Sequence, residues 1–200
     1  MKSSRFERNV VLLGSSGVGK TSIVTKYTSG IFDSMSSHAT VGVSFTAQTF
    51  MVNNIMFTMN IWDTAGQERY KSLASIYFKD KDAIIIIFSL DAKSTFSDIN
   101  EWHSELKKYY AKFPPILIVG NKADIEECSF EVDSKTAAKF AESIGANYLE
   151  VSAKTGQNIE KLFNDVASAL INSSEVQDAE QHEKMIKLTD FSDENKQKCC

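Results

Sequence analysis

The sequence has no long apolar run, few cysteines and no excess of basic residues. Its longest uninterrupted apolar stretch, Ala83–Phe88, has six residues, whereas a membrane-spanning helix needs about 18 or more. Three cysteines, two of them adjacent at positions 199 and 200, predict no disulfide framework and indicate a reducing compartment, the cytosol. With 26 acidic against 22 basic residues the net charge is −4, which argues against a nucleic-acid binder that neutralises phosphates. The polar start MKSSRFERN leads into only four apolar residues, so we expect no secretory signal.

A length of 200 residues fits one domain followed by a short tail. Residues 172–200 contain no glycine or proline, and they hold seven acidic residues against four lysines. This segment therefore carries most of the net charge and few large apolar side chains. We expect a domain at 1–171 and a flexible tail at 172–200.

Short runs rich in valine and isoleucine alternate with helical patterns along the domain. Such runs predict strands buried on both faces of a parallel sheet, here at 10–13, 83–88 and 116–119. Apolar residues at steps of three and four predict a helix that begins near Ser94 and keeps its apolar face as far as Phe113. The same spacing predicts a last helix over 159–170.

Two extended runs, 45–52 and 56–62, flank the pair Asn53-Asn54. Asparagine tolerates positive φ, so we expect a tight antiparallel hairpin there. The predicted fold class is α/β, a three-layer α/β/α sandwich around a six-stranded, mostly parallel sheet with one antiparallel hairpin strand. Ligands of such sheets bind beyond the carboxyl ends of the strands, so the loops there should carry the chemistry.

The loop after the first predicted strand reads GSSGVGKT, a full G-x-x-x-x-G-K-[ST] match between a strand and a helix. Its backbone N–H groups can turn toward phosphates, and the helix N-terminus adds positive charge. Lys20 would reach the β- and γ-phosphates, and the Thr21 hydroxyl would bind Mg²⁺. The alternative is a glycine-rich turn that happens to precede a lysine. The residues predicted to bind nucleotide phosphates are Ser15, Ser16, Gly17, Val18, Gly19, Lys20, Thr21 and Ser22.

The sequence NKAD, Asn121–Asp124, follows the predicted strand 116–119 and addresses the base. A carboxylate at Asp124 can accept two hydrogen bonds from the N–H edge of guanine, whereas adenine offers no such pair of donors. SAK, Ser152 to Lys154, follows a predicted strand over 147–151 and would support the same base from a second loop. An ordinary exposed loop is the alternative. The residues predicted to bind guanine are Asn121, Lys122, Asp124, Ser152, Ala153 and Lys154.

A third loop, DTAGQE, follows the second hairpin strand. Asp63 would accept a hydrogen bond from a water molecule on Mg²⁺. Gly66 would let a backbone N–H approach the γ-phosphate, and Gln67 would orient the attacking water. The alternatives are a helix cap for Asp63 and simple solvent exposure for Gln67.

GSSGVGKT, WDTAGQERY, NKAD and SAK, in this order and spacing, resemble small GTPases of the Ras superfamily over residues 6–171. VGVSF at 41–45, RYKSLASIYF at 69–78 and the final Cys-Cys resemble the Rab branch. SFTAQTF and ERYKSLA look closest to its early-endosomal subfamily. The resemblance implies a GTP hydrolase that binds GTP or GDP with Mg²⁺ and acts as a membrane-anchored switch in vesicle trafficking.

The resemblance also implies roles for residues outside these motifs. Thr40 would bind Mg²⁺ in the GTP state, and Phe32, twelve residues after Lys20, would lie edge-on to guanine. The alternatives are an ordinary loop threonine and a core residue at the end of the first helix. By the same resemblance, Cys199 and Cys200 would both carry geranylgeranyl groups. Two chains matter physically, since one lipid chain gives only marginal attachment.

The partners that the resemblance implies are a GTPase-activating protein, a guanine-nucleotide exchange factor, a GDP-dissociation inhibitor, a prenylation escort and GTP-state effectors. We expect no nucleic-acid partner and a monomeric protein. It would cycle between the cytosol and the cytoplasmic face of an endomembrane, with endosomes as the candidate.

The sequence departs from the family pattern in its first switch segment. One extra residue lies between Lys20 and Thr40, within 34–39, and no tyrosine occurs there. Ser44 replaces an acid, and Asp80 stands where glycine is usual. These changes leave open an alternative function, a nucleotide-locked binding module with impaired switching.

Hydrolysis should be slow without a partner. Serine at position 16 is common among Rabs, whereas glycine there favours fast assisted hydrolysis in Ras. Arg69, two residues past Gln67, does not act as an arginine finger in this family. A P-loop ATPase or kinase is disfavoured by Asp124 and by the absence of a lid segment.

Overall fold

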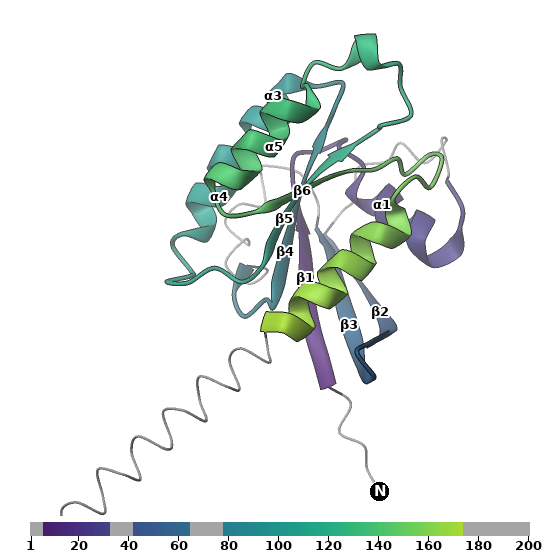
Figure 1. Cartoon of the computed structure of the whole chain (residues 1–200), viewed down its shortest axis with the longest axis vertical. Coiled ribbons are helices and arrows are strands. Elements are labelled where there is room, and N and C mark those ends of the chain that lie inside the picture. The colour runs from purple at the N-terminus through teal and green to yellow at the C-terminus, as the bar shows by residue number, and fades with distance from the viewer. Residues whose placement is uncertain (1–5, 33–41, 65–77, 174–200) are drawn as a thin grey trace, which may run out of the picture.

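The computed structural model of the chain describes residues 6–32, 42–64 and 78–173. Six strands form one sheet in the order β2-β3-β1-β4-β5-β6 (Figure 1). β2 pairs antiparallel with β3, and the other pairings are parallel. This sheet confirms the predicted α/β class. The strands are β1 (Phe6–Leu13), β2 (Val43–Val52), β3 (Ile55–Thr64), β4 (Ala83–Ser89), β5 (Ile116–Asn121) and β6 (Asn147–Glu150).

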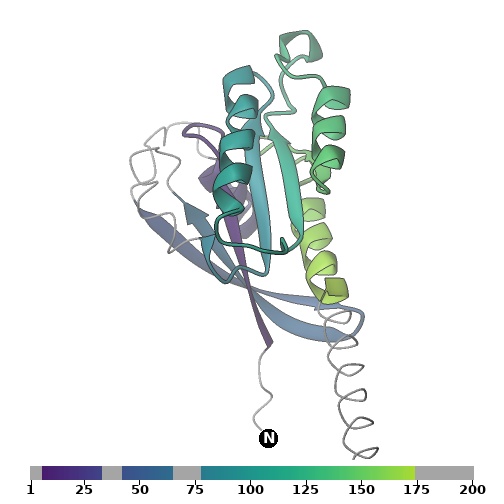
Figure 2. The ribbon, with the colours of Figure 1, turned by 90° about the vertical axis from the view of Figure 1, so that its left-hand side faces the viewer.

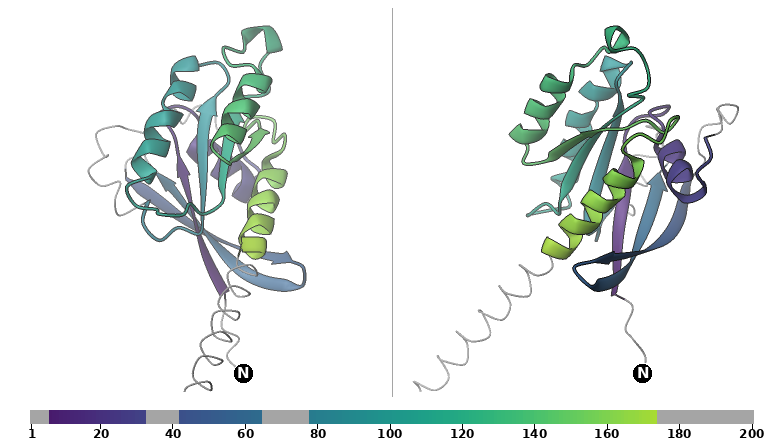
Figure 3. Two further views of the ribbon diagram at one scale, coloured as in Figure 1. Left: turned by 60° about the vertical axis from the view of Figure 1, so that its left-hand side comes forward. Right: turned by 45° about the vertical axis from the view of Figure 1, so that its right-hand side comes forward.

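Helices cover both faces of this sheet. α3, α4 and α5 lie on one face, and α1 with the helix over residues 159–173 lies on the other (Figure 3, right). The three layers are those that the alternation of strands and helices predicts. The remaining bounds are α1 (Lys20–Ser29), α3 (Lys93–Ser97), α4 (Ile99–Leu106), the 3₁₀ turn η2 (Glu127–Ser129) and α5 (Ser134–Ser143).

The central strand β1 contributes side chains to two hydrophobic clusters, one on each face of the sheet. Val10 and Leu12 pack in the cluster of α1 and the last helix, whereas Val11 and Leu13 pack in the cluster of α4 and α5. All four are essentially inaccessible to solvent. Because successive side chains of a strand point to opposite faces, an uninterrupted apolar run is what a strand between two helical layers requires.

The predicted hairpin is confirmed. Asn53 and Asn54 have φ values of 50° and 62°, the left-handed conformation that a two-residue hairpin turn needs. β3 continues to Thr64, so Asp63 belongs to the strand rather than to the loop after it. Asp80 also has a positive φ, 56°, which explains why a glycine is usual at that position.

The single helix predicted from Ser94 to Phe113 is wrong at its C-terminal end, because the observed helical segment stops before the apolar pattern does. The structure has α3 and α4 in its place, separated by Asp98, and α4 ends at Leu106. After α4, the Tyr110 hydroxyl donates to the Phe78 backbone oxygen and accepts from the Lys81 backbone N–H. Phe113 precedes a proline, which disfavours helical backbone.

The last helix extends through residue 173, two residues beyond the predicted domain boundary. The parallel strands all end at the same edge of the sheet, and the loops that follow them lie opposite the first residues of β1 (Figure 2). This edge is where ligands of doubly wound sheets bind.

Candidate nucleotide-binding site

The loop between β1 and α1 packs closely against the ends of two other strands. Gly14 has φ 137°, and a Cβ atom there would lie 2.1 Å from the backbone oxygen of Ile87. Gly19 has φ 92°, and its Cβ would lie 2.3 Å from the side-chain nitrogen of Asn121. Both positions therefore require glycine, for the conformation and for the space. The loop backbone thus lies close against β4 and β5.

Lys20, the first residue of α1, is a buried cation with only 5% of its surface exposed. Its Nζ donates to the backbone oxygens of Gly14 at 2.7 Å and Ser15 at 2.9 Å. Burial lowers the pKa of the Lys20 ammonium to about 8, although the nearby Asp63 carboxylate acts to raise it. A partly desolvated ammonium beside the N-terminus of α1 is an arrangement that favours an anion.

Asp63 faces this loop from the end of β3 and is 1% exposed. Its Oδ2 accepts hydrogen bonds from Thr21 Oγ1 at 2.7 Å and Ser44 Oγ at 3.4 Å. Its Oδ1 is buried and has no hydrogen-bond partner among the described residues. Burial raises the pKa of the Asp63 carboxyl, while Thr21, Lys20 and Ser44 act to lower it. A buried oxygen without a partner is costly, and a water molecule on a Mg²⁺ ion held by the Thr21 hydroxyl would satisfy it.

Asn121 connects the loop after β1 to the loop after β6. Its Nδ2 donates to the Val18 backbone oxygen at 2.8 Å, and its Oδ1 accepts from the Ala153 backbone N–H at 3.1 Å. The residue is 2% exposed. One side chain thus fixes the spacing between the predicted phosphate loop and the predicted base loop.

Asp124 presents an ionised carboxylate held by two residues of the SAK segment. Ser152 Oγ donates to its Oδ1 at 2.7 Å, and Lys154 Nζ lies 3.3 Å from its Oδ2. Burial alone would raise the pKa of Asp124, but the bonds from Ser152 and Lys154 hold it below its usual value. At neutral pH this group is therefore a hydrogen-bond acceptor without a proton.

Lys122, between Asn121 and Asp124, has a left-handed backbone with φ 71°. Its Nζ lies 3.0 Å and 3.1 Å from the two carboxylate oxygens of Asp91, which follows β4. The ion pair brings the loop after β4 against the loop after β5.

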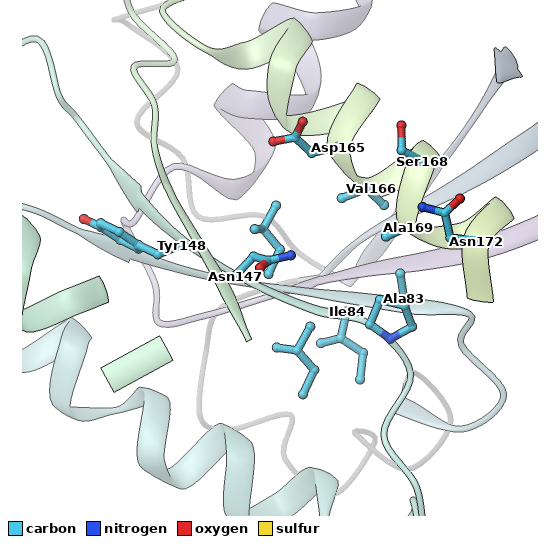
Figure 4. A pocket seen from close by; sticks show the side chains of 12 residues that line it. Ala83, Ile84, Asn147, Tyr148, Asp165, Val166, Ser168, Ala169 and Asn172 are labelled. Carbon is cyan, nitrogen blue, oxygen red and sulfur yellow. The ribbon is translucent and has the colours of Figure 1, made fainter. Parts of the chain in front are cut away.

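A separate cavity lies at the opposite end of the sheet. It has a volume of about 420 Å³ and is lined by the first residues of β4, β5 and β6 together with one side of the last helix. Asp165, Ser168 and Asn172 border it from that helix (Figure 4). It contains none of the predicted site residues.

Comparison with known proteins decides the family. A model of the Ras family matches residues 9–172, most of the chain. The Ras-related protein Rab-30 of Homo sapiens is 37% identical over 174 residues, which cover 87% of this chain and 85% of that protein. The chain belongs to the Ras family, as a Rab GTPase. The Ras-related protein Rab-31 of Rattus norvegicus is 40% identical over 161 residues, covering 80% of this chain and 82% of that protein.

As a member of this family, the Rab GTPase binds guanine nucleotide and hydrolyses GTP, which confirms the predicted enzyme class. Within the described residues, no helix of the Rab GTPase is both long and apolar enough to cross a bilayer.

The structure of the Rab GTPase places most predicted site residues at one end of the sheet. Phe32 packs half-buried against the cluster of α1 and the last helix. Five predicted residues lie outside the described part of the chain: Thr40, Gly66, Gln67, Cys199 and Cys200. Those that the structure gathers at the carboxyl ends of the strands are Ser15, Ser16, Gly17, Val18, Gly19, Lys20, Thr21, Ser22, Asp63, Asn121, Lys122, Asp124, Ser152, Ala153 and Lys154.

Sequence reasoning missed three polar residues of this site. Ser44, noted only as a departure from the family pattern, donates to Asp63. Asp91 pairs with Lys122, and Asp98 accepts from Ser15. The Asp91 and Asp98 contacts join separate segments of the chain, so no local motif predicts them, whereas Ser44 and Asp63 are cross-strand partners in the hairpin of β2 and β3.

Proposed function

We propose that this Rab GTPase is a membrane-anchored switch that holds GTP or GDP together with Mg²⁺. The nucleotide and the ion would lie among the loops after β1, β5 and β6 and the end of β3. The observation that carries the proposal is the Asn121 side chain, which joins the lysine-bearing phosphate loop to the loop beside Asp124. A site that spaces a buried cation and an ionised carboxylate in this way suits a ligand with phosphates at one end and an N–H-bearing base at the other.

In this proposal the backbone amides of residues 15–22 and the Lys20 ammonium bind the phosphates. Thr21 and Thr40 supply hydroxyl oxygens to Mg²⁺, and Asp63 binds it through a water molecule. The ion neutralises charge on the phosphate oxygens when it is bound. The buried, unpartnered Asp63 Oδ1 supports this assignment.

Guanine is recognised by Asp124, with Asn121, Lys122 and residues 152–154 holding the loops around it. The Ser152 and Lys154 bonds keep the Asp124 carboxylate ionised, so it can accept from the two N–H groups of guanine. Phe32 would contact the edge of the base.

The experiment that tests the switch compares two nucleotide states of the full chain. The protein is loaded with GDP or with a non-hydrolysable GTP analogue, and the proteins that each form retains from lysate are compared. Partners retained only by the GTP form are expected. Equal retention by both forms would favour the nucleotide-locked module, and loss of bound guanine nucleotide on purification would contradict the site itself.

We expect intrinsic hydrolysis of GTP to be slower than roughly 1 per second, since no arginine finger is supplied within the chain. Gln67 orients the attacking water, so Gln67→Leu should slow phosphate release by at least about tenfold. Single-turnover phosphate release measures both. Gln48→Leu, on β2, is the matched control and should hydrolyse at the wild-type rate. Turnover near 1 per second by the purified protein alone would contradict the need for an activating partner.

We also propose that residues 1–171 form the GTPase domain and that residues 172–200 tether it to membranes through lipids on Cys199 and Cys200. In this scheme an escort-dependent transferase attaches the geranylgeranyl groups to the two cysteines. A GDP-dissociation inhibitor extracts the lipidated protein from the membrane. The protein would act as a monomer on the cytoplasmic face of an endomembrane, with endosomes as the first compartment to examine.

Replacing Cys199 and Cys200 together with serine should move the protein from the membrane fraction to the soluble fraction of cells. Two lipid chains are needed for stable attachment, so the single Cys200→Ser variant should be only weakly retained. Cys128 is exposed in the structure, and Cys128→Ser serves as the control that should stay on membranes. Persistence of the double variant on membranes would refute this anchor.

Affinity for GDP should fall as the pH is raised above about 8, the lowered pKa of Lys20. Phosphate oxygens favour the charged ammonium, so binding takes up a proton above that pKa. The affinity should then fall by up to about tenfold per pH unit. Titration of a fluorescent GDP analogue at increasing pH measures this slope, and a flat profile would contradict it.

Lys20→Gln is the control for this slope, because any change that remains in that variant comes from the nucleotide. The stability of the ligand-free protein should show the opposite sign. Burial lowers the pKa of Lys20 from 10.5 to about 8, so between these values the unfolded chain binds more protons than the folded one. The free energy of unfolding contributed by this group therefore rises with pH across that range.

A further inference from the structure

A side-chain hydrogen bond joins the phosphate loop to the junction between α3 and α4. Ser15 Oγ donates to Asp98 Oδ2 at 2.5 Å, between residues 83 positions apart in the chain. Both residues are half-buried. The GSSGVGKT motif assigns Ser15 no side-chain role, and Asp98 belongs to none of the nucleotide-binding motifs.

Asp98 directs its carboxylate to this loop rather than to its own helix. It occupies the N-cap position of α4, where aspartate commonly accepts from a backbone N–H in the first turn, yet its side chain makes no such capping bond. Its backbone oxygen accepts from the N–H groups of Glu101 and Trp102, so the backbone at Asp98 is fixed by the helix. The next residue, Ile99, is completely buried. The carboxylate is therefore presented from a rigid support.

Ser15 is held from two sides. Its hydroxyl donates to Asp98, and its backbone oxygen accepts from Lys20 Nζ at 2.9 Å. These contacts fix both the side chain and the carbonyl of Ser15 at the entrance of the phosphate loop. The orientation of the Lys20 ammonium therefore depends in part on Ser15, which Asp98 holds in place.

We propose that Asp98 and Ser15 form a positioning pair that keeps the phosphate loop in its nucleotide-binding shape and so sets how long GDP stays bound. This inference rests on the proposed function of the loop. Asp98 carries a negative charge and would repel phosphates, so its contribution comes from ordering the loop before the ligand arrives. Loss of such ordering weakens binding mainly through faster dissociation.

The experiment measures dissociation of a fluorescent GDP analogue from the full chain, in Mg²⁺ with excess unlabelled GDP. Asp98→Ala and Ser15→Ala should each release the analogue about tenfold faster, the size expected for one hydrogen bond to a charged group. The double variant should release it no faster than either single variant, because both remove the same contact. Asp98→Asn keeps an acceptor oxygen and should stay within about threefold of wild type.

Asn100→Ala, an exposed position on α4, is the matched control and should release the analogue at the wild-type rate. Urea unfolding of each variant without nucleotide separates positioning from folding, since a positioning role predicts midpoints close to wild type. A large drop in the midpoint of Asp98→Ala that Asp98→Asn shares would assign the residue to fold stability instead and overturn the proposal.

Two failures can be told apart. If wild type does not bind GDP, the proposed function of the site is wrong. If wild type binds and Lys20→Ala does not, but Asp98→Ala releases at the wild-type rate, only the positioning pair is refuted. A double variant whose rate change is the product of the two single changes would also refute it, because the residues would then act independently.

Discussion

Asp124→Asn is expected to bind GDP about 10²-fold more weakly and to gain affinity for xanthosine diphosphate. The wild-type carboxylate can accept from both N–H groups of guanine, whereas an amide accepts at one atom and donates at the other. On guanine, the amide would place one N–H against another. Xanthine carries a carbonyl oxygen in place of the amino group, so it accepts the bond that the amide donates.

Competition of both diphosphates against a fluorescent GDP analogue measures this exchange of preference. The substitution keeps an oxygen that can accept from Ser152 Oγ, which bonds to Asp124 at 2.7 Å in wild type, so the loop should keep its shape. Asp165→Asn, at a surface ion pair on the last helix, is the matched control and should bind GDP as wild type does. An unchanged preference for GDP in Asp124→Asn would show that another group selects the base.

The second large effect is expected for Asn121→Ala. The change removes both bonds of a side chain that is 2% exposed and leaves the Val18 carbonyl and the Ala153 amide without that partner. Two buried polar groups without partners should lower the free energy of unfolding by about 3 kcal/mol. Dissociation of GDP should become about 10²-fold faster, since both loops lose their common support.

Urea unfolding and GDP dissociation measure the two effects separately. Asn147→Ala, at an exposed position on β6, removes the same kind of side chain without these contacts and should leave both values near wild type. A variant that dissociates GDP normally despite lower stability would show that the loops do not depend on Asn121.

The sheet could be predicted because burial on two faces leaves a strong mark on sequence. Ala83–Phe88 reads as a continuous apolar run, and β4 is buried at every residue. The turn at Asn53-Asn54 could also be predicted, because few residue pairs adopt positive φ twice in succession. The end of α4 was not, since Tyr110 and Phe113 keep the apolar spacing of a helix while packing from a loop. Periodicity reports which side chains face the core, and it does not report the backbone that carries them.

The candidate site divides in the same way. Backbone-driven features such as the phosphate loop are local in sequence, so the motif identifies them directly. The contacts of Asp91 with Lys122 and of Asp98 with Ser15 arise from packing between separate segments, whereas Ser44 meets Asp63 across the paired strands β2 and β3. Ordinary polar residues in loops carry no periodic signal, and only the folded structure brings such pairs together.

Asn121 bonds to both Val18 and Ala153. The positions of the phosphate loop and the base loop therefore depend on each other through this one side chain. Under the proposed function, a disturbance of the phosphate loop would shift Val18 and reach the base loop through Asn121 and Ala153. We then expect the contacts to the phosphates and to the base to be lost together. An exchange factor would then need to displace only one of the two loops to release the nucleotide. An incoming nucleotide that binds one loop would help to order the other loop.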